Sequence, residues 1–160
     1  MSSISFKSVG IKQTSPSLFS KKSPRPIGIK TPLNLGTGQS GIFDMHFNFP
    51  SQIKDNLRNL LLTNHGDRLG RYAFGANLNE LAFELTSKED FDQYAMLNIK
   101  DAVERSMPFI ELSEFESDFV DISARNVEDG MTSVSIKVTY NVPKLKIVND
   151  AIGVKLLVGG

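Results

Sequence analysis

The stretch LLLTNHGDRLGRYAFGANLNELAFE, residues Leu60–Glu84, joins two leucine-rich segments through a turn that contains three glycines. Asp67, Arg68 and Arg71 lie within this turn. A guanidinium has five N–H donors and can bond loop carbonyls and a carboxylate together. We therefore expect Arg68 and Arg71 to hold a turn between two helices, with Asp67 as a partner and Phe74 packed in the core.

A catalytic interpretation of the same turn would rest on a dyad of His65 and Asp67. No serine stands nearby as an obvious nucleophile. The chain has only two histidines and no cysteine, which excludes most nucleophilic triads. The sequence thus favours a polar turn over an active site.

The acid-rich segment 111–121 is the other place where catalysis could be located. Its acids are Glu111, Glu114, Glu116, Asp118 and Asp121. Two of them could supply the paired carboxylates of a glycosidase. Alternate residues of a strand face solvent, however, so a solvated strand face explains the run better.

Helical periodicity predicts one helix on each side of the turn. The first is expected to start at Pro50 and to end at residues 63–66, with Gly66 as its C-terminal cap. The second is a short helix that follows Gly75. Apolar residues at helical spacing form the buried faces: Ile53, Leu57, Leu60 and Leu61 in the first, and Leu78, Leu81, Ala82 and Leu85 in the second.

A third helix is predicted after the pair Ser87 and Asp90, which resembles a capping box. Pro108 should stop it. Its buried face is expected to contain Phe91, Ala95, Ile99, Ala102 and Val103.

The remaining sequence is typical of strands. Segment 133–142 is the clearest, with apolar residues at every second position: Val134, Ile136, Val138, Tyr140 and Val142. Residues 128–130 supply a turn before it. Segment 109–124 predicts two short strands or one bent strand, and segment 144–160 predicts a hairpin around 149–153 or one extended arm. This order indicates an α+β fold with three helices packed on a small, mainly antiparallel sheet.

The N-terminal part differs in composition from the rest. Residues 1–41 are proline- and glycine-rich and are expected to form an extended arm, and residues 42–160 a folded domain. Ile27, Ile29 and Leu33 could be buried against the domain or a neighbour. Residues 42–50 alternate apolar and polar side chains, which predicts a half-buried strand with His46 on its polar face.

Charge is unevenly distributed although the net charge is zero. Residues 1–43 contain six basic residues and no acid, so the rest of the chain carries a net negative charge. A basic arm could bind nucleic acid or an acidic protein, but six scattered charges favour a solvated tail or a protein contact. The sequence has no apolar run of membrane-spanning length and no secretory signal, so we expect a soluble protein made in a cytoplasm, without membrane or nucleic-acid partners.

The turn and its flanking helices resemble the hallmark of the sheath initiators, the baseplate wedge proteins of contractile phage tails. That pattern is a leucine-rich helix, then Thr-x-x-Gly-Glu-Arg, Arg-Pro-x-Phe-Gly and Leu-x-x-x-Leu-Phe-Glu. The matching residues are Thr63, Gly66, Arg68, Arg71, Phe74, Gly75, Leu78, Phe83 and Glu84. Asp67 replaces the family's Glu and Tyr72 its proline. The resemblance extends over residues 25–142.

One departure from the family pattern lies at the end of the long helix. Family members carry Glu-Pro-Arg-Ile, where this chain has Met107-Pro108-Phe109-Ile110. Pro108 is kept, but both charges are missing. Contacts that the family's Glu and Arg make to wedge partners must therefore differ here.

The resemblance implies a structural protein without catalytic activity or cofactor. It would dock on the core of the baseplate wedge, in several copies of a six-fold assembly. It would also pair strands with the tail sheath, and we expect Val134, Ile136, Val138, Tyr140 and Val154 to lie in the pairing strands. Its location would be the virion, after assembly in the host cytoplasm.

Two other functions stay open at this point. The fold of this family also occurs in the type VI secretion baseplate and in a bacterial anti-adaptor that binds a regulatory protein. Some family members have been named lysozymes, so a peptidoglycan-cleaving enzyme is the alternative from another class. The missing Glu and the lack of a good acid pair argue against it.

Overall fold

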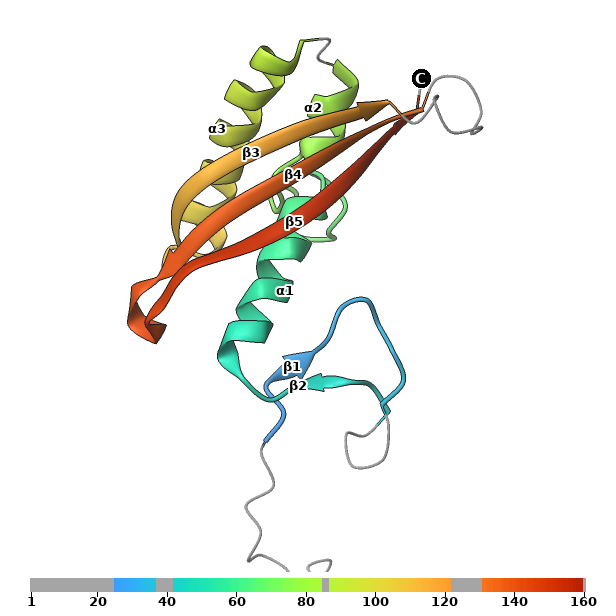
Figure 1. The fold of residues 1–160 in the computed structure, drawn as a ribbon. Coiled ribbons are helices and arrows are strands. Elements are labelled where there is room, and N and C mark those ends of the chain that lie inside the picture. The colour runs from blue at the N-terminus through green and yellow to red at the C-terminus, as the bar shows by residue number, and fades with distance from the viewer. Residues whose placement is uncertain (1–24, 37–41, 85–86, 122–130, 160) are drawn as a thin grey trace, which may run out of the picture.

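The computed structural model describes residues 25–36, 42–84, 87–121 and 131–159. A curved three-stranded sheet lies across three helices, and a two-stranded hairpin lies near the start of the first helix (Figure 1). The elements in chain order are β1 (Gly28–Ile29), β2 (Met45–His46), α1 (Phe49–Leu62), α2 (Leu78–Glu84), α3 (Lys88–Ser106), β3 (Glu111–Asp121), β4 (Met131–Val142), the 3-10 turn η4 (Pro143–Leu145) and β5 (Ile147–Gly159). The predicted α+β class is confirmed.

The helices begin and end close to where the sequence predicts. Asn48 caps α1 by accepting a hydrogen bond from the Ser51 N–H (3.0 Å), so the helix begins one residue before Pro50. Ser87 caps α3 in the same way by accepting from the Asp90 N–H at 3.2 Å. That helix ends at Ser106, before Pro108 as expected. The prediction for Gly66 is wrong, because Thr63 is the C-cap of α1.

The sheet is antiparallel in the order β3-β4-β5. Its central strand β4 pairs on one side with β3, as in Phe115↔Val138, and on the other with β5, as in Ile136↔Val154. The expectation that residues 133–142 belong to a partner-binding edge is therefore wrong, since the protein itself occupies both sides of β4. The outer strands are β3 and β5.

For each outer strand the structure matches one of the two alternatives left open by the sequence, namely a single strand. Segment 109–124 contains one strand, with an irregularity between Leu112 and Glu114. The turn between β4 and β5 is η4, followed by Lys146 in the left-handed conformation (φ 55°). The hairpin around 149–153 does not form, and the alternative of one extended segment is correct. The expected turn at 128–130 and the side chain of Leu85 lie outside the described residues.

One hydrophobic core fills the space between the helices and the sheet. The predicted faces of the three helices are buried, together with every second residue of β4. Phe91 of α3 packs edge-on against Phe119 of β3, with ring centroids 5.3 Å apart. The Tyr140 hydroxyl, within this core, donates to Asp150 of β5 at 2.9 Å. Val134, Ile136, Val138, Tyr140 and Val154 thus face the core, so their side chains build the sheet rather than a surface.

Candidate partner-binding surfaces

The turn between α1 and α2 is held by main-chain hydrogen bonds rather than by its arginines. The Gly66 N–H donates to the Tyr72 carbonyl at 2.9 Å, and the Arg71 N–H donates to the Arg68 carbonyl at 3.1 Å. The Asp67 carboxylate accepts from the Asn64 N–H at 2.8 Å. Both arginine side chains are exposed, and no Asp67–arginine ion pair forms among the described residues. The prediction of an arginine-centred network is wrong.

Arg68 instead lies over the ring of Phe74, with its guanidinium carbon 3.7 Å from the ring centroid. Phe74 is half-buried and packs against the core, as expected. A cation over an aromatic ring at an exposed site stabilises by about 0.5–1 kcal/mol. Arg68 therefore shields the outer side of Phe74.

This geometry predicts a small effect of removing the arginine. Arg68→Ala should lower the free energy of unfolding by about 0.5–1 kcal/mol, and urea denaturation would measure it. The matched control is Arg71→Ala, which should change it by less than about 0.5 kcal/mol. A loss of about 3 kcal/mol or more in either variant would indicate a buried charged network and would contradict the exposed geometry.

The end of the turn closes onto the C-terminus of α1. The Ala76 N–H donates to the Leu60 carbonyl at 3.1 Å, and the Asn77 N–H to the Thr63 carbonyl at 3.4 Å. The last carbonyls of a helix have no partner within it, so these two bonds satisfy groups that would otherwise need water. They require Gly75 to pass directly over Thr63 with φ 111°. Gly75 is thus a structural position of the motif.

The other motif residues divide between core and surface. Leu78 is buried, whereas Phe83, Glu84 and Pro108 are exposed. Leu69 and Tyr72 in the turn are exposed as well. The outer side of the motif thus presents apolar groups that a partner could cover.

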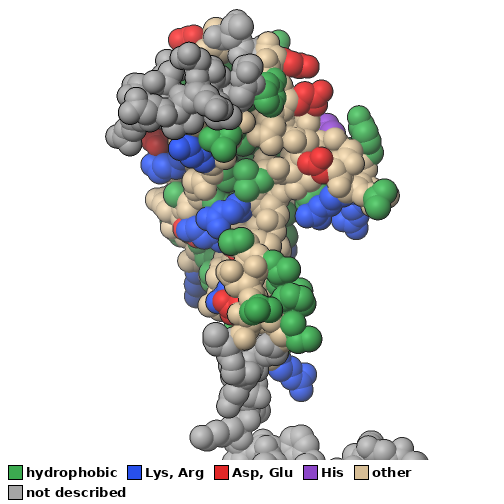
Figure 2. All heavy atoms as spheres, turned by 90° about the vertical axis from the view of Figure 1, so that its right-hand side faces the viewer, with side chains coloured by type: hydrophobic (Ala, Val, Ile, Leu, Met, Phe, Trp, Pro, Cys, Tyr) green, Lys and Arg blue, Asp and Glu red, His purple; other side chains and the backbone are tan. Residues whose placement is uncertain are grey.

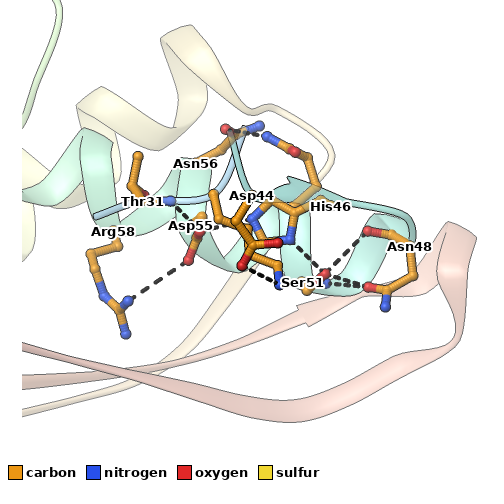
Figure 3. A network of polar contacts seen from close by, with 10 residues as sticks. Thr31, Asp44, His46, Asn48, Ser51, Asp55, Asn56 and Arg58 are labelled. Carbon is orange, nitrogen blue, oxygen red and sulfur yellow. Dashed lines mark hydrogen bonds and ion pairs between the residues drawn. The ribbon is translucent and has the colours of Figure 1, made fainter. Parts of the chain in front are cut away.

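The arm is attached to α1 through Asp55. The Asp55 carboxylate accepts from the Thr31 N–H at 3.0 Å and contacts His46 Nε2 at 2.7 Å (Figure 3). The other ring nitrogen of His46 lies 2.9 Å from the Ser51 hydroxyl. Asp55 therefore connects both sides of the β1–β2 hairpin to the helix.

His46 is 4% exposed, so the prediction that it lies on a polar outer face is wrong. The strand expected over 42–50 shrinks to Met45–His46, because Asn48 already caps α1. Burial suits His46 because both of its ring nitrogens have partners on that helix. The alternating phenylalanines do not become a core face, since Phe47 and Phe49 are exposed.

Ser51, His46 and Asp55 form a serine–histidine–carboxylate chain that sequence reasoning missed. The spacing of Ser51 and Asp55 within one helix turn was its only signal in the sequence. The Ser51 hydroxyl also lies within hydrogen-bond distance of Asn48 Oδ1 at 2.5 Å, and the imidazole is buried. A serine nucleophile needs an open approach to its hydroxyl and a histidine free to shuttle the proton. We therefore assign this chain of contacts to attachment of the arm.

The pKa of the Asp55 carboxyl is below its ordinary value of 3.8. Burial raises it, but the hydrogen bonds from the Thr31 N–H and His46, with the charges of His46 and Arg58, outweigh burial. A lowered carboxyl pKa stabilises the fold above the ordinary value, and this stabilisation is lost as the pH falls through the folded-state pKa. The arm should therefore loosen in acid below about pH 4.

Removing the carboxylate should release the arm at neutral pH. Asp55→Ala leaves the Thr31 N–H and His46 without their partner, so we expect a loss of about 2–3 kcal/mol. Hydrogen exchange at the Thr31 amide would measure it. Asp44→Ala is the control, because the Asp44 carboxylate forms its ion pair with the partly exposed Lys30 at 2.9 Å and makes no hydrogen bond to Thr31 among the described contacts. Equal Thr31 protection in the Asp55 variant and the unaltered protein would contradict this attachment.

The hairpin carries an exposed apolar surface. Its exposed side chains are Ile27, Ile29, Leu33, Leu35, Ile42, Phe47 and Phe49. Apolar side chains gather at the surface toward this end of the molecule (Figure 2). A contiguous group of this kind is typical of protein–protein contact sites.

The outer edge of β5 is a second candidate surface, because no strand pairs with it among the described residues. The Ala151 N–H donates to the side chain of Asp150 at 2.9 Å rather than across the sheet. Antiparallel pairing alternates along a strand, so the N–H groups of Gly153 and Lys155 also point away from β4. The N–H groups of Gly153 and Lys155 form a template for an added strand.

Asp150 anchors β5 to the rest of the protein. Its carboxylate accepts from the Tyr140 hydroxyl, and Lys54 of α1 lies 3.0 Å from it. Burial raises the pKa of Asp150, but Lys54 and Tyr140 outweigh burial and lower it. β5 is therefore fixed to α1, while no strand pairs with its outer edge among the described residues.

The acids of β3 lie on an exposed face of the strand. Glu111, Glu114, Glu116 and Asp118 are exposed, as expected for a solvated face. Glu116 pairs with Lys137 at 2.8 Å. The side chain of Asp121 lies outside the described residues. No group of His, Cys, Asp and Glu suited to a metal ion occurs in the described part of the chain.

Comparison with solved structures identifies the fold. The chain is similar to a component of the anti-feeding prophage baseplate, with a TM-score of 0.55 and 15% identity over 71% of this chain and 82% of that one. This chain shares the fold of that baseplate component. A crystallised candidate tail lysozyme from Geobacter sulfurreducens is also similar, with a TM-score of 0.50 and 20% identity over 72% of this chain and 95% of that one.

No protein-family model and no curated protein matches this chain. No helix among the described ranges is long and apolar enough to cross a membrane. The likeness to these solved structures therefore concerns the fold.

Proposed function

We propose that this protein is a structural component of a contractile-tail baseplate. In this role it docks on wedge proteins and starts the sheath by pairing strands with it. The observation that carries the proposal is the open outer edge of β5 on a baseplate-type fold. Strand addition uses main-chain hydrogen bonds and needs an edge that does not move. The contacts of Asp150 with Tyr140 and Lys54 provide that rigidity.

The contact with wedge proteins is proposed for a surface of apolar side chains rather than a strand edge. The exposed apolar group of the β1–β2 hairpin suits the helical, apolar surface of a wedge core. The exposed Phe83 and Tyr72 near the motif extend the apolar surface available to partners. Such a protein would be present in several copies of a six-fold assembly in the virion and would need no cofactor.

Co-assembly with the tail proteins of the same virus tests the proposal. The protein should form a complex with wedge proteins, and the complex should recruit sheath subunits, as measured by size-exclusion chromatography. The absence of any complex with either class would refute the role.

The lysozyme alternative has its own test. Purified protein added to cell walls should leave their turbidity unchanged. Glu111→Gln is the control, because Glu111, Glu114 and Asp118 are the dense acids that a glycosidase would use. Lysis that this substitution abolishes would establish the enzyme. The third candidate, a cytoplasmic anti-adaptor, would instead bind one regulatory protein and no tail protein.

A further inference from the structure

A groove separates α3 from the first half of β3. Its volume is about 360 Å³, and apolar side chains form its walls. They are Met96, Ile99 and Val103 from α3, Leu112 and Phe115 from β3, and Val138 from β4. Met96 is 53% exposed, so the groove opens to the surface.

The groove borders the unpaired outer edge of β3. β3 is an outer strand, and no strand pairs with its outer side among the described residues. A strand added here would gain main-chain hydrogen bonds along β3. Every second side chain of the added strand would then point into the groove, because strand side chains alternate between faces.

The rim of the groove is acidic. Glu104, Glu111 and Glu114 lie at the rim, and Lys100 is the basic residue that lines it. Lys100 is 3.9 Å from Glu104, which leaves the two β3 glutamates without a basic partner in the groove lining. The occupant of this groove should therefore be a basic strand with apolar residues at alternate positions.

The N-terminal sequence of this chain has that composition. Residues 1–24 contain four lysines and no acid. Within them, SISFKSVGIK (residues 3–12) places Ile4 and Phe6 two positions apart, next to Lys7. Val9 and Ile11 are also two positions apart, next to Lys12, but in a continuous strand they would lie on the face opposite to Ile4 and Phe6. Ile4 and Phe6 would share one face of a strand, and the lysines would be free to meet the glutamates.

We propose that residues 3–12 of this chain add as a strand to the outer edge of β3, with Ile4 and Phe6 in the groove. Residues 12–25 can span about 40 Å when extended, which sets the reach of the segment from Arg25. This inference does not depend on the proposed function. It assigns the acidic run of β3 a role as the receptor for the basic arm.

Cysteine crosslinking of the full-length chain tests the proposal, because the chain has no cysteine of its own. Ile4→Cys and Phe6→Cys are each combined with Met96→Cys at the groove. The control combines each with Leu62→Cys, an exposed position on α1. Oxidation should crosslink at least one of the two arm positions to position 96 severalfold more than to position 62. Adding Glu111→Lys and Glu114→Lys should reduce this preference.

Equal yields at positions 96 and 62 for both arm cysteines, or no crosslink at either, would overturn the proposal. A preference that survives reversal of both glutamates would overturn the charge argument. Mixing isotopically labelled and unlabelled chains shows whether the arm belongs to the same chain or to a neighbour. Because the assay contains no wedge or sheath protein, its failure would leave the baseplate proposal intact.

Discussion

Gly75→Ala should lower the free energy of unfolding by about 3–5 kcal/mol, the largest effect on stability that we expect from adding a single methyl group. A Cβ at this position would lie 2.1 Å from the Thr63 carbonyl oxygen, which belongs to the main chain and cannot rotate away. The residue also has φ 111°, a conformation that side chains disfavour. The loop would have to move away from the end of α1. The hydrogen bonds donated by the Ala76 and Asn77 N–H groups would then be lost.

Two other glycines of the same turn are matched controls. Gly70 has φ 75° and open space around the added Cβ, so Gly70→Ala should cost only about 1 kcal/mol of backbone strain. A Cβ at Gly66 would meet only the ring of Tyr72, at 3.3 Å, and the side chain can yield. Urea denaturation of the three variants should rank Gly75 far above the others. Similar losses for Gly75→Ala and Gly70→Ala would contradict the close packing on Thr63.

Lys155→Pro should abolish sheath assembly while the protein stays folded. The Lys155 N–H points away from β4, so proline removes a hydrogen-bond donor from the open edge and none from the sheet. Circular dichroism should match that of the unaltered protein, and the sheath assembly assay should show no polymer. Lys155→Ala is the control, because it removes the side chain and keeps the N–H.

Val154 is not a suitable place for the same experiment. Its side chain is buried and it pairs with Ile136, so proline there would damage the core and the β4–β5 pairing. Normal sheath assembly by a folded Lys155→Pro protein would contradict pairing at this edge.

The helices could be predicted from the sequence because their signals are local. The spacing of Ile53, Leu57, Leu60 and Leu61 defines one face of a helix, and the Ser87 cap marks where another begins. Both signals depend on residues within a few positions of each other. Segment 133–142 was equally clear as a strand, since every second residue is apolar.

The order of the strands could not be predicted in this way. Alternation in 133–142 shows a strand with one buried face, but a central strand and an edge strand have the same pattern. That β4 is central follows from which segments pair with it, which is a property of the whole fold. The turn at η4 was missed because residues 149–153 contain the stronger turn signal, with Asn149 and Gly153.

The candidate sites were predicted less well, because they depend on contacts between residues of different elements. His46 looked like a surface residue because its neighbours alternate, and its burial depends on Ser51 and Asp55 in the following helix. The arginines of the motif looked structural because of their donors, whereas the main chain around Gly75 holds the turn. The unpaired outer edges of β3 and β5 became visible only with the strand order.

A density map of the assembled baseplate with its first sheath ring tests the central claim most directly. We expect an additional strand, contributed by a sheath subunit, hydrogen-bonded to the outer edge of β5 from Ala151 to Lys155. We also expect wedge proteins to cover the exposed side chains of the β1–β2 hairpin. A map in which the protein is present but the outer edge of β5 faces solvent would contradict the account.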